Sequence, residues 1–223
     1  MSNLALANHN LYTKVNKVLY STDIGYIDYS AYKNYDARYE TEMCRQENDA
    51  IKKLFLSVHK NTVGNRIVDL GCGTGLLLDL SGPHIFQPLY TGIDICGDMI
   101  EKAAGKYPFC KFITADAEIA IKEIENQHDI IVSLFSIPYI GTSTLDDVYR
   151  ILRPGGYFFA VYYRWPFVNP SSVYVDKKEH YITDVLPQVD RFIDKAYQLF
   201  KCVYNRKLIA DSQAYNVALF QKV

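Results

Sequence analysis

The chain has 223 residues, 49% of them hydrophobic, which suffices to bury the core of one domain with a small addition. Its 24 basic and 25 acidic residues nearly cancel, and a net charge of −1 argues against the strongly basic surface that a nucleic-acid substrate requires. Five scattered cysteines without a Cys-x-x-Cys pair, and no apolar run of membrane-spanning length, lead us to expect reduced thiols, no bound metal, no membrane segment and a cytoplasmic location.

The N-terminal region is rich in tyrosine and precedes the first strong strand pattern. We interpret residues 1–40 as a small helical cap and residues 41–223 as the main domain. Tyr29 belongs to a series of tyrosines spaced three or four residues apart, which places their rings on one helical face. These rings either pack amphipathically or form an aromatic lid over a ligand. Arg38 pairs either with a ligand carboxylate or with neighbouring acids.

The central feature of the sequence is a buried-strand pattern, Ile67–Leu70, that runs directly into a glycine-rich turn, Gly71–Gly75. Glycine reaches positive φ at low cost and allows a ligand to approach the backbone closely. The apolar run Leu76–Leu80 then opens a helix, so the stretch predicts a nucleotide-type site at a helix N-terminus. The spacing Gly-x-Gly-x-Gly matches neither the dinucleotide fingerprint nor the P-loop. Asp69, just before the turn, suits a ligand that carries an ammonium group.

The next two strands are each followed by an acidic residue that can bind a nucleoside. The pattern predicts a strand over residues 89–95. Asp94, near its end, lies at about the spacing from the glycine turn where an acid accepts hydrogen bonds from ribose hydroxyls. The role of a helix N-cap suits Asp98 better than Asp94. We expect a helix that begins at Asp98 and is stopped by Gly105. After a third strand, Asp116 either contacts a ligand or caps the following helix.

The remaining pattern predicts a mostly parallel sheet that closes with a hairpin. A fourth strand ends at Leu134, where ligands bind in open α/β sheets. We expect a segment over residues 165–187 to cap the substrate, and His128 to lie on the surface or in a turn. The fold class is therefore α/β, with a doubly wound seven-stranded sheet and an antiparallel C-terminal hairpin. The later elements are a helix over 119–126, a helix over 145–152, a turn over 153–156, a strand over 157–161, a helix over 189–200 and two strands over 202–209 and 215–222.

This order of motifs resembles the class I S-adenosylmethionine (SAM)-dependent methyltransferases of small-molecule type. The glycine turn matches their motif I, and the Leu-Arg-Pro-Gly-Gly run at 152–156 recurs in the same superfamily. The resemblance covers about residues 35–222 and implies a Rossmann-like fold with SAM as cofactor. It implies that the cofactor-binding residues are Tyr35, Arg38, Asp69, Gly71, Cys72, Gly73, Gly75, Asp94, Ile95, Met99, Asp116, Ala117 and Leu134.

The resemblance further implies methyl transfer by in-line displacement to a small-molecule or peptide acceptor. Methyltransferases that act on nucleic-acid amines carry Asn/Asp-Pro-Pro-Tyr/Phe after the fourth strand, whereas this chain has Phe-Ser-Ile-Pro-Tyr at 135–139. We therefore expect no nucleic-acid partner. His180 is the first candidate for a general base, although it also suits an ordinary surface position, and Tyr139 can orient an acceptor. The expected substrate-pocket residues are Tyr29, Tyr139, Arg164 and His180.

Two other functions fit the same motifs. One is a catalytically inactive SAM-binding module or partner subunit, because retained cofactor residues do not require catalysis. The other is an aminopropyltransferase-like enzyme on the same scaffold, although the acidic cluster that such enzymes use for polyamines is not evident after the fourth strand.

Overall fold

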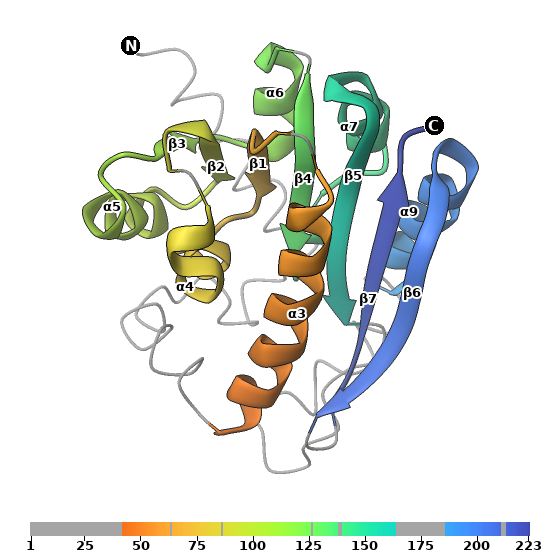
Figure 1. The fold of residues 1–223 in the computed structure, drawn as a ribbon. Coiled ribbons are helices and arrows are strands. Elements are labelled where there is room, and N and C mark those ends of the chain that lie inside the picture. Colours follow the sequence, from red (N-terminus) through yellow and green to blue (C-terminus); the bar gives the residue numbers. More distant parts are fainter. Residues whose placement is uncertain are drawn as a thin grey trace, which may run out of the picture.

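The computed structural model describes residues 42–62, 64–85, 87–125, 127–137, 140–163, 186–210 and 213–223. These residues form a seven-stranded sheet with helices on both faces (Figure 1). The main elements are α3 (Glu42–Lys60), β1 (Ile67–Leu70), α4 (Leu76–Ser81), β2 (Tyr90–Asp94), α5 (Gly97–Lys106), β3 (Lys111–Thr114), α6 (Ala117–Ala120), β4 (His128–Leu134), α7 (Thr144–Ile151), β5 (Leu152–Tyr163), α9 (Leu186–Leu199), β6 (Lys201–Ala210) and β7 (Gln213–Gln221). Short 3-10 helices η2 (Gly82–His84), η3 (Gln87–Leu89) and η4 (Ile121–Glu123) join them.

The strand order is β3-β2-β1-β4-β5-β7-β6. The first five strands are parallel, and β7 lies antiparallel between β5 and β6. The predicted doubly wound sheet and its C-terminal hairpin are therefore confirmed. Because the order reverses between β1 and β4, the carboxyl ends of β1, β2 and β4 border the crevice in which open α/β sheets bind ligands.

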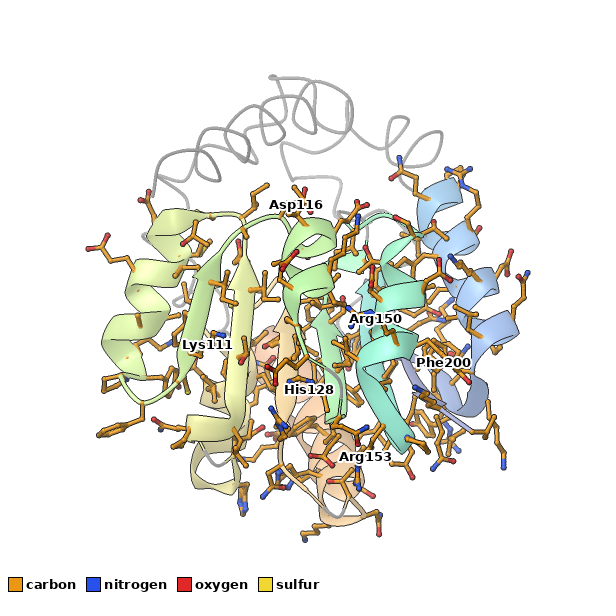
Figure 2. The ribbon with its side chains drawn as sticks, turned by 90° about the horizontal axis from the view of Figure 1, so that it is seen from above. Lys111, Asp116, His128, Arg150, Arg153 and Phe200 are labelled. Atoms are coloured by element: carbon orange, nitrogen blue, oxygen red, sulfur yellow. The ribbon has the colours of Figure 1, made fainter. Side chains whose placement is uncertain are left out.

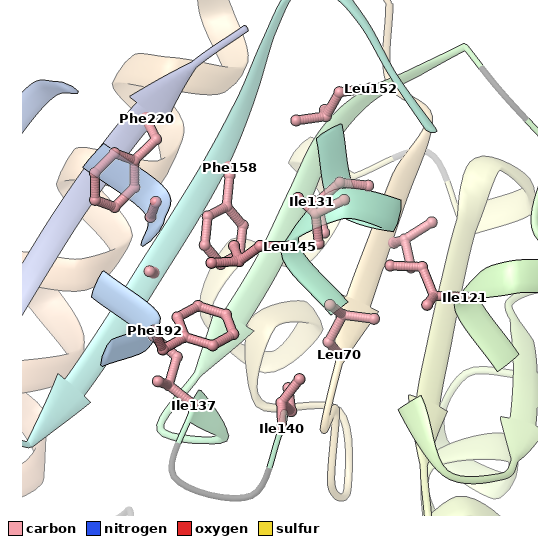
Figure 3. Close-up of a cluster of buried hydrophobic side chains, with 14 of the residues drawn as sticks. Leu70, Ile121, Ile131, Ile137, Ile140, Leu145, Leu152, Phe158, Phe192 and Phe220 are labelled. Atoms are coloured by element: carbon pink, nitrogen blue, oxygen red, sulfur yellow. The ribbon is translucent and has the colours of Figure 1, made fainter. Parts of the chain in front are cut away.

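Two apolar layers enclose the sheet. Side chains of β1, β4, β5 and β7 alternate between the two faces, as the period of two in a strand requires. One face packs against α3 and α4, including Phe55 and Leu77, and the other packs against α6, α7 and α9. Figure 3 shows the second layer, in which Phe158 lies near Leu145 and Phe192. Burial on both faces explains why β1 is apolar except at Asp69 and why Ile130–Val132 in the middle of β4 are all apolar.

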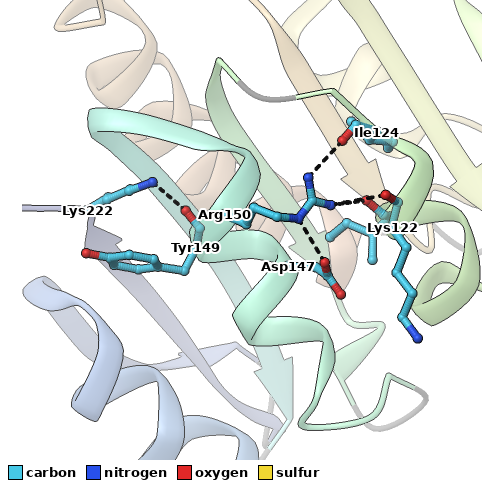
Figure 4. Close-up of polar contacts among 7 residues, drawn as sticks. Lys122, Ile124, Asp147, Tyr149, Arg150 and Lys222 are labelled. Atoms are coloured by element: carbon cyan, nitrogen blue, oxygen red, sulfur yellow. Dashed lines mark hydrogen bonds and ion pairs between the residues drawn. The ribbon is translucent and has the colours of Figure 1, made fainter.

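Two basic side chains fix the C-terminal ends of helices at the side of the sheet opposite the glycine turn (Figure 4). Lys222 Nζ donates to the carbonyls of Tyr149 and Leu152, at 2.7 Å each, at the end of α7. Arg150 donates to the carbonyls of Ile121 and Ile124, at 2.9 and 3.2 Å, around the end of η4. Positive charge at a helix C-terminus is favourable because the last carbonyls lack partners within the helix.

Several local predictions are wrong. Gly105 does not end α5, which continues to Lys106, and Asp98 does not cap it, because the N-cap position is Cys96. The helix expected over 119–126 is short: α6 ends at Ala120 and passes into η4. The residues expected to form a turn over 153–156 lie within β5, and the β4–β5 register shifts there.

The prediction that His128 lies on the surface or in a turn is also wrong, because its side chain is buried at the start of β4. Burial lowers the pKa of His128, so its imidazole is held neutral inside the sheet. Figure 2 shows it towards the same end of the molecule as Arg153, away from Asp116. Among the described helices, none combines the length and the apolar character needed to cross a lipid bilayer.

Candidate functional site

The glycine turn follows β1 with a backbone that favours glycine. Gly71, Gly73 and Gly75 have φ values of 72°, 54° and 93°. A side chain in this left-handed region is disfavoured because its Cβ crowds the backbone. The turn therefore leads from the buried strand into α4, whose N-cap is Gly75, with no side chain projecting from these three positions.

Asp94, at the end of β2, braces this turn. The amides of Gly71 and Cys72 donate to the carbonyl of Ile93, at 2.8 and 3.0 Å. The amide of Gly73 donates to Asp94 Oδ2 at 2.8 Å, and the amide of Cys96 donates to Asp94 Oδ1 at 2.9 Å. Burial raises the pKa of Asp94, whereas these amide hydrogen bonds lower it. Because each carboxylate oxygen has two acceptor sites, Asp94 keeps capacity for a ligand hydroxyl.

Asp69 is an acid buried directly beneath the turn. It is 1% exposed, and the hydroxyl of the fully buried Tyr90 donates to its Oδ2 at 2.8 Å. Its other oxygen, Oδ1, accepts no hydrogen bond from the part of the chain that the structure describes. Burial raises the pKa of Asp69 to about 7, against the opposing effect of the Tyr90 hydrogen bond. A buried acceptor without a donor is unfavourable, which marks this oxygen as a place for an external donor.

Asp116 and Ala117 lie just beyond the carboxyl end of β3. Asp116 is the N-cap of α6, and its Oδ1 accepts from the amide of Glu118 at 2.7 Å. The capping role that the sequence left open is therefore present, and a ligand contact would add to it. Burial raises the pKa of Asp116. The amide of Ala115 donates to the carbonyl of Asp94 at 3.0 Å, so this segment is attached to the end of β2.

The other expected cofactor residues within the described part lie around the same end of the sheet. Leu134 is buried at the end of β4. Ile95 and Met99 are half-buried after β2. The buried Cys72 thiol has a pKa well above its ordinary value because of burial, so it is a neutral packing group. Several predicted site residues lie outside the described residues, namely Tyr29, Tyr35, Arg38, Tyr139, Arg164 and His180. The expected cap 1–40 also lies outside them, as does the cap segment 165–187 except for its last two residues, which begin α9.

Sequence reasoning missed four residues that build the site. Tyr90 supplies the donor to Asp69, and Gly92 makes room for a neighbouring thiol: a Cβ there would lie 2.8 Å from Cys72 Sγ. Ser136 donates to the carbonyl of Leu70, next to the glycine turn, and Glu118 binds the loop after β4. A glycine inside a strand often marks a place where another part of the chain or a ligand approaches the backbone closely, so the sequence could have indicated Gly92. The other three have no such signal, because their partners are distant in sequence.

Comparison with known proteins gives one family match and several curated relatives. Residues 67–156 match the family model described as "Methyltransferase domain". Trans-aconitate 2-methyltransferase of Paracidovorax citrulli is 26% identical over 121 residues, which are 53% of this chain and 45% of that protein. Malonyl-(acyl-carrier protein) O-methyltransferase of Priestia megaterium is 28% identical over 116 residues, which are 51% of this chain and 42% of that protein. The chain thus spans less than half the length of these relatives.

Solved structures agree over nearly the whole chain. A carbon methyltransferase, CurJ, superimposes with a TM-score of 0.66 at 16% identity, covering 98% of this chain and 71% of that one. The N-methyltransferase NodS of Bradyrhizobium japonicum, in complex with S-adenosylhomocysteine, superimposes with a TM-score of 0.61 at 16% identity, covering 96% and 98%. At such low identity, these structures establish a shared fold.

Proposed function

We propose, from the match of residues 67–156 to the methyltransferase-domain family model, that this chain binds SAM and transfers its methyl group to a small molecule or peptide. The resemblance to the class I SAM-dependent methyltransferases is confirmed by that match and by the shared fold. The names of the relatives and neighbours span oxygen, carbon and nitrogen acceptors. The proposal therefore concerns the donor and the transfer and names no acceptor atom.

The observation that carries the proposal is the buried Asp69 Oδ1, which lacks a donor among the described residues and directly precedes the glycine turn. SAM carries an ammonium group, which is a donor that an ionised Asp69 would bind. Its ribose hydroxyls would bind Asp94, which the turn already holds in place through Gly73. Its adenine amine would bind Asp116, and a ring nitrogen would accept from the backbone of Ala117. These residues thus offer a partner for the ammonium group, the ribose hydroxyls and the adenine of the cofactor.

The chain has a positioning role in such a reaction. Bound SAM supplies a sulfonium methyl group that is ready for in-line displacement. Orientation of two reactants by a protein contributes up to roughly 7–11 kcal/mol to lowering a barrier. The rigid attachment of the glycine turn to Ile93 and Asp94 fits this role, because a fixed turn fixes one reactant. A general base is required only where the acceptor begins protonated.

For binding of the methyl acceptor, we propose the same residues that the sequence indicated. Tyr139 follows the end of β4, and His180 and Arg164 belong to the segment around 165–187, which we propose as the substrate cap. Tyr35 and Arg38 of the proposed cap 1–40 are assigned to the methionine end of SAM, and Tyr29 to the acceptor. We also propose a cytoplasmic location, for which the free thiols of Cys72, Cys96, Cys110 and Cys202 are supportive.

Two measurements test the proposal. Isothermal titration of the full chain with SAM and with S-adenosylhomocysteine should give saturable binding at one site, and absence of both would refute it. Incubation with methyl-labelled SAM and a panel of carboxylates, phenols, amines, thiols and peptides should transfer label to at least one acceptor. Tight SAM binding with no transfer would instead support an inactive binding module, and transfer of an aminopropyl group from decarboxylated SAM would support the polyamine-type enzyme.

A further inference from the structure

The loop between β4 and α7, residues 135–143, is attached at both ends to segments of the proposed cofactor site. It begins at the carboxyl end of β4, where an acceptor is expected to enter. One attachment comes from the residue just before the glycine turn, and the other from the residue just after Asp116–Ala117. These two segments are distant in sequence, so the tertiary structure alone joins them through this loop.

The first attachment is Ser136. Its hydroxyl donates to the carbonyl of Leu70 at 2.5 Å and lies 2.6 Å from the hydroxyl of Ser133. Both serines are buried. A Cβ on Gly71 would overlap the Cβ of Ser136, so the loop presses directly on the first glycine of the turn. Phe135 has a φ of 61°, a conformation that a bulky residue adopts only where surrounding contacts hold it.

The second attachment is Glu118. Its Oε1 accepts from the amide of Gly141 at 2.7 Å, and its Oε2 accepts from the hydroxyl of Ser143 at 3.1 Å. A Cβ on Gly141 would overlap this carboxylate, so a side chain there would displace it from its present position. Hydrogen bonds to an ionised carboxylate are about twice as strong as neutral ones. Glu118 also donates its own amide to Asp116, which joins the loop to the proposed adenine contact.

Between the two attachments, Ile137 and Ile140 are 1% and 8% exposed and belong to the core. Figure 3 shows both at one edge of the apolar layer, with Ile140 below Leu70. The described part of the loop is therefore held by two polar anchors and two buried side chains. In sequence, the candidate Tyr139 lies between the two isoleucines.

From these contacts we infer that Ser136 and Glu118 are positioning residues that couple occupation of the cofactor site to the placement of the acceptor loop. The inference rests on the proposed function, because it assumes that the glycine turn and Asp116–Ala117 hold SAM. A ligand that orders these two segments would favour the anchored loop, and by thermodynamic reciprocity the anchored loop would favour the ligand. Neither residue is required to touch SAM.

The test measures the loop and the ligand separately. Hydrogen exchange of peptides spanning residues 135–143 is followed by mass spectrometry in the full chain, with and without S-adenosylhomocysteine. Glu118→Ala should accelerate exchange of this loop about tenfold or more without ligand, because it removes both charged hydrogen bonds. It should also weaken binding of S-adenosylhomocysteine about three- to tenfold and abolish the protection that the ligand gives the loop.

Matched variants separate positioning from general damage. Glu118→Gln keeps a carbonyl that accepts from Gly141 and offers an amide to the hydroxyl of Ser143. It should therefore retain most of the slow exchange of the loop and most of the affinity for S-adenosylhomocysteine. Glu123→Ala removes an exposed acid from η4 and should change neither the exchange of the loop nor the affinity for the ligand. Ser136→Ala should act like Glu118→Ala at the other end of the loop. Ser81→Ala removes a buried hydroxyl that lacks a hydrogen-bond partner among the described residues, and should leave the loop unchanged.

The outcomes distinguish the inference from the proposed function. If the wild-type chain fails to bind S-adenosylhomocysteine, the proposed function is wrong and the inference is overturned with it. If the wild type binds and Glu118→Ala exchanges and binds like wild type, the inference alone is overturned. Faster exchange with unchanged affinity would likewise overturn the coupling, because Glu118 would then be a purely local anchor.

Discussion

Tyr90 donates a hydrogen bond of 2.8 Å to Asp69, and both side chains are completely enclosed at the base of the glycine turn. Because this bond reaches only Oδ2, it leaves Asp69 Oδ1 without a donor among the described residues. Burial raises the pKa of Asp69 to about 7, so its charge changes close to neutral pH. We therefore expect the stability of the chain, and the ligand affinity that we propose for it, to depend on pH.

Replacement of this acid should change how stability depends on pH. The folded pKa of Asp69 is raised from 3.8 to about 7, so its contribution to stability is fully present below pH 4 and is lost as pH rises to 7. Asp69→Asn cannot ionise and should escape this loss, gaining up to about 4 kcal/mol relative to wild type between pH 4 and 8. Urea unfolding at several pH values measures it. Asp98→Asn, at an exposed position, should differ from wild type by less than about 0.5 kcal/mol.

The same carboxyl should make cofactor affinity dependent on pH. An ammonium group binds the ionised form of Asp69, and that form is depleted as the pH falls below about 7. Affinity for S-adenosylhomocysteine should therefore fall by up to about tenfold for each pH unit below 7, as isothermal titration from pH 5.5 to 8 can show. In Asp69→Asn the affinity should be lower and its dependence on pH weaker. Equal pH profiles for the two proteins would remove Asp69 from the ammonium site.

Two glycine substitutions should have opposite effects on stability. Gly71→Ala places a side chain at a φ of 72° and overlaps Ser136, so it should destabilise the fold by about 2 kcal/mol or more. Gly105 lies exposed within α5, and a Cβ there meets nothing within 4 Å. Gly105→Ala should stabilise by about 0.5–1 kcal/mol, because alanine is the better helix former. Thermal and urea unfolding compare the two, and equal changes would contradict the account of the turn.

Asp94 should affect both ligand binding and stability, and two substitutions separate these effects. Asp94→Asn keeps one acceptor oxygen but loses the charge, and it should weaken binding of S-adenosylhomocysteine about tenfold or more. Asp94→Ala also removes the partner of the Gly73 and Cys96 amides, so it should lower the unfolding temperature as well. Titration and circular dichroism on both variants separate the effects. Affinity equal to wild type in a folded Asp94→Asn would exclude the ribose role.

A buried acid at the other end of the sheet should affect stability alone. Asp129 is 4% exposed, with Oδ1 at 2.5 Å from Arg153 Nε and Oδ2 accepting from the amide of Arg66 at 2.8 Å. Asp129→Ala should cost about 3 kcal/mol, because it leaves the Arg66 amide without its acceptor and the Arg153 guanidinium without its counter-charge. Affinity for S-adenosylhomocysteine should stay at the wild-type value when the variant is measured while folded. A parallel loss of affinity would show that the two ends of the sheet are coupled.

Local pattern was sufficient for the order of the elements. Mostly apolar runs such as Ile67–Leu70 and the glycine spacing after them predicted a parallel α/β sheet, because a strand covered on both faces is predominantly apolar. Predictions of element boundaries were wrong where the local preference of a residue and its tertiary contacts disagree. Gly105 reads as a helix end by propensity, yet α5 continues one residue beyond it. The Arg153–Gly156 run reads as a turn, yet it lies within β5 next to β4.

The sequence alone determined the likeness to a methyltransferase and the identity of the acids that follow the strands, because those signals lie within a few residues of one another. Only the tertiary structure decided what those acids do. It buried Asp69 beside Tyr90, attached Asp94 to Gly73, and joined Ser136 and Glu118 to one loop. Hydrogen bonds and desolvation depend on distances of a few ångströms between residues 21 or more positions apart, and sequence spacing does not encode those distances.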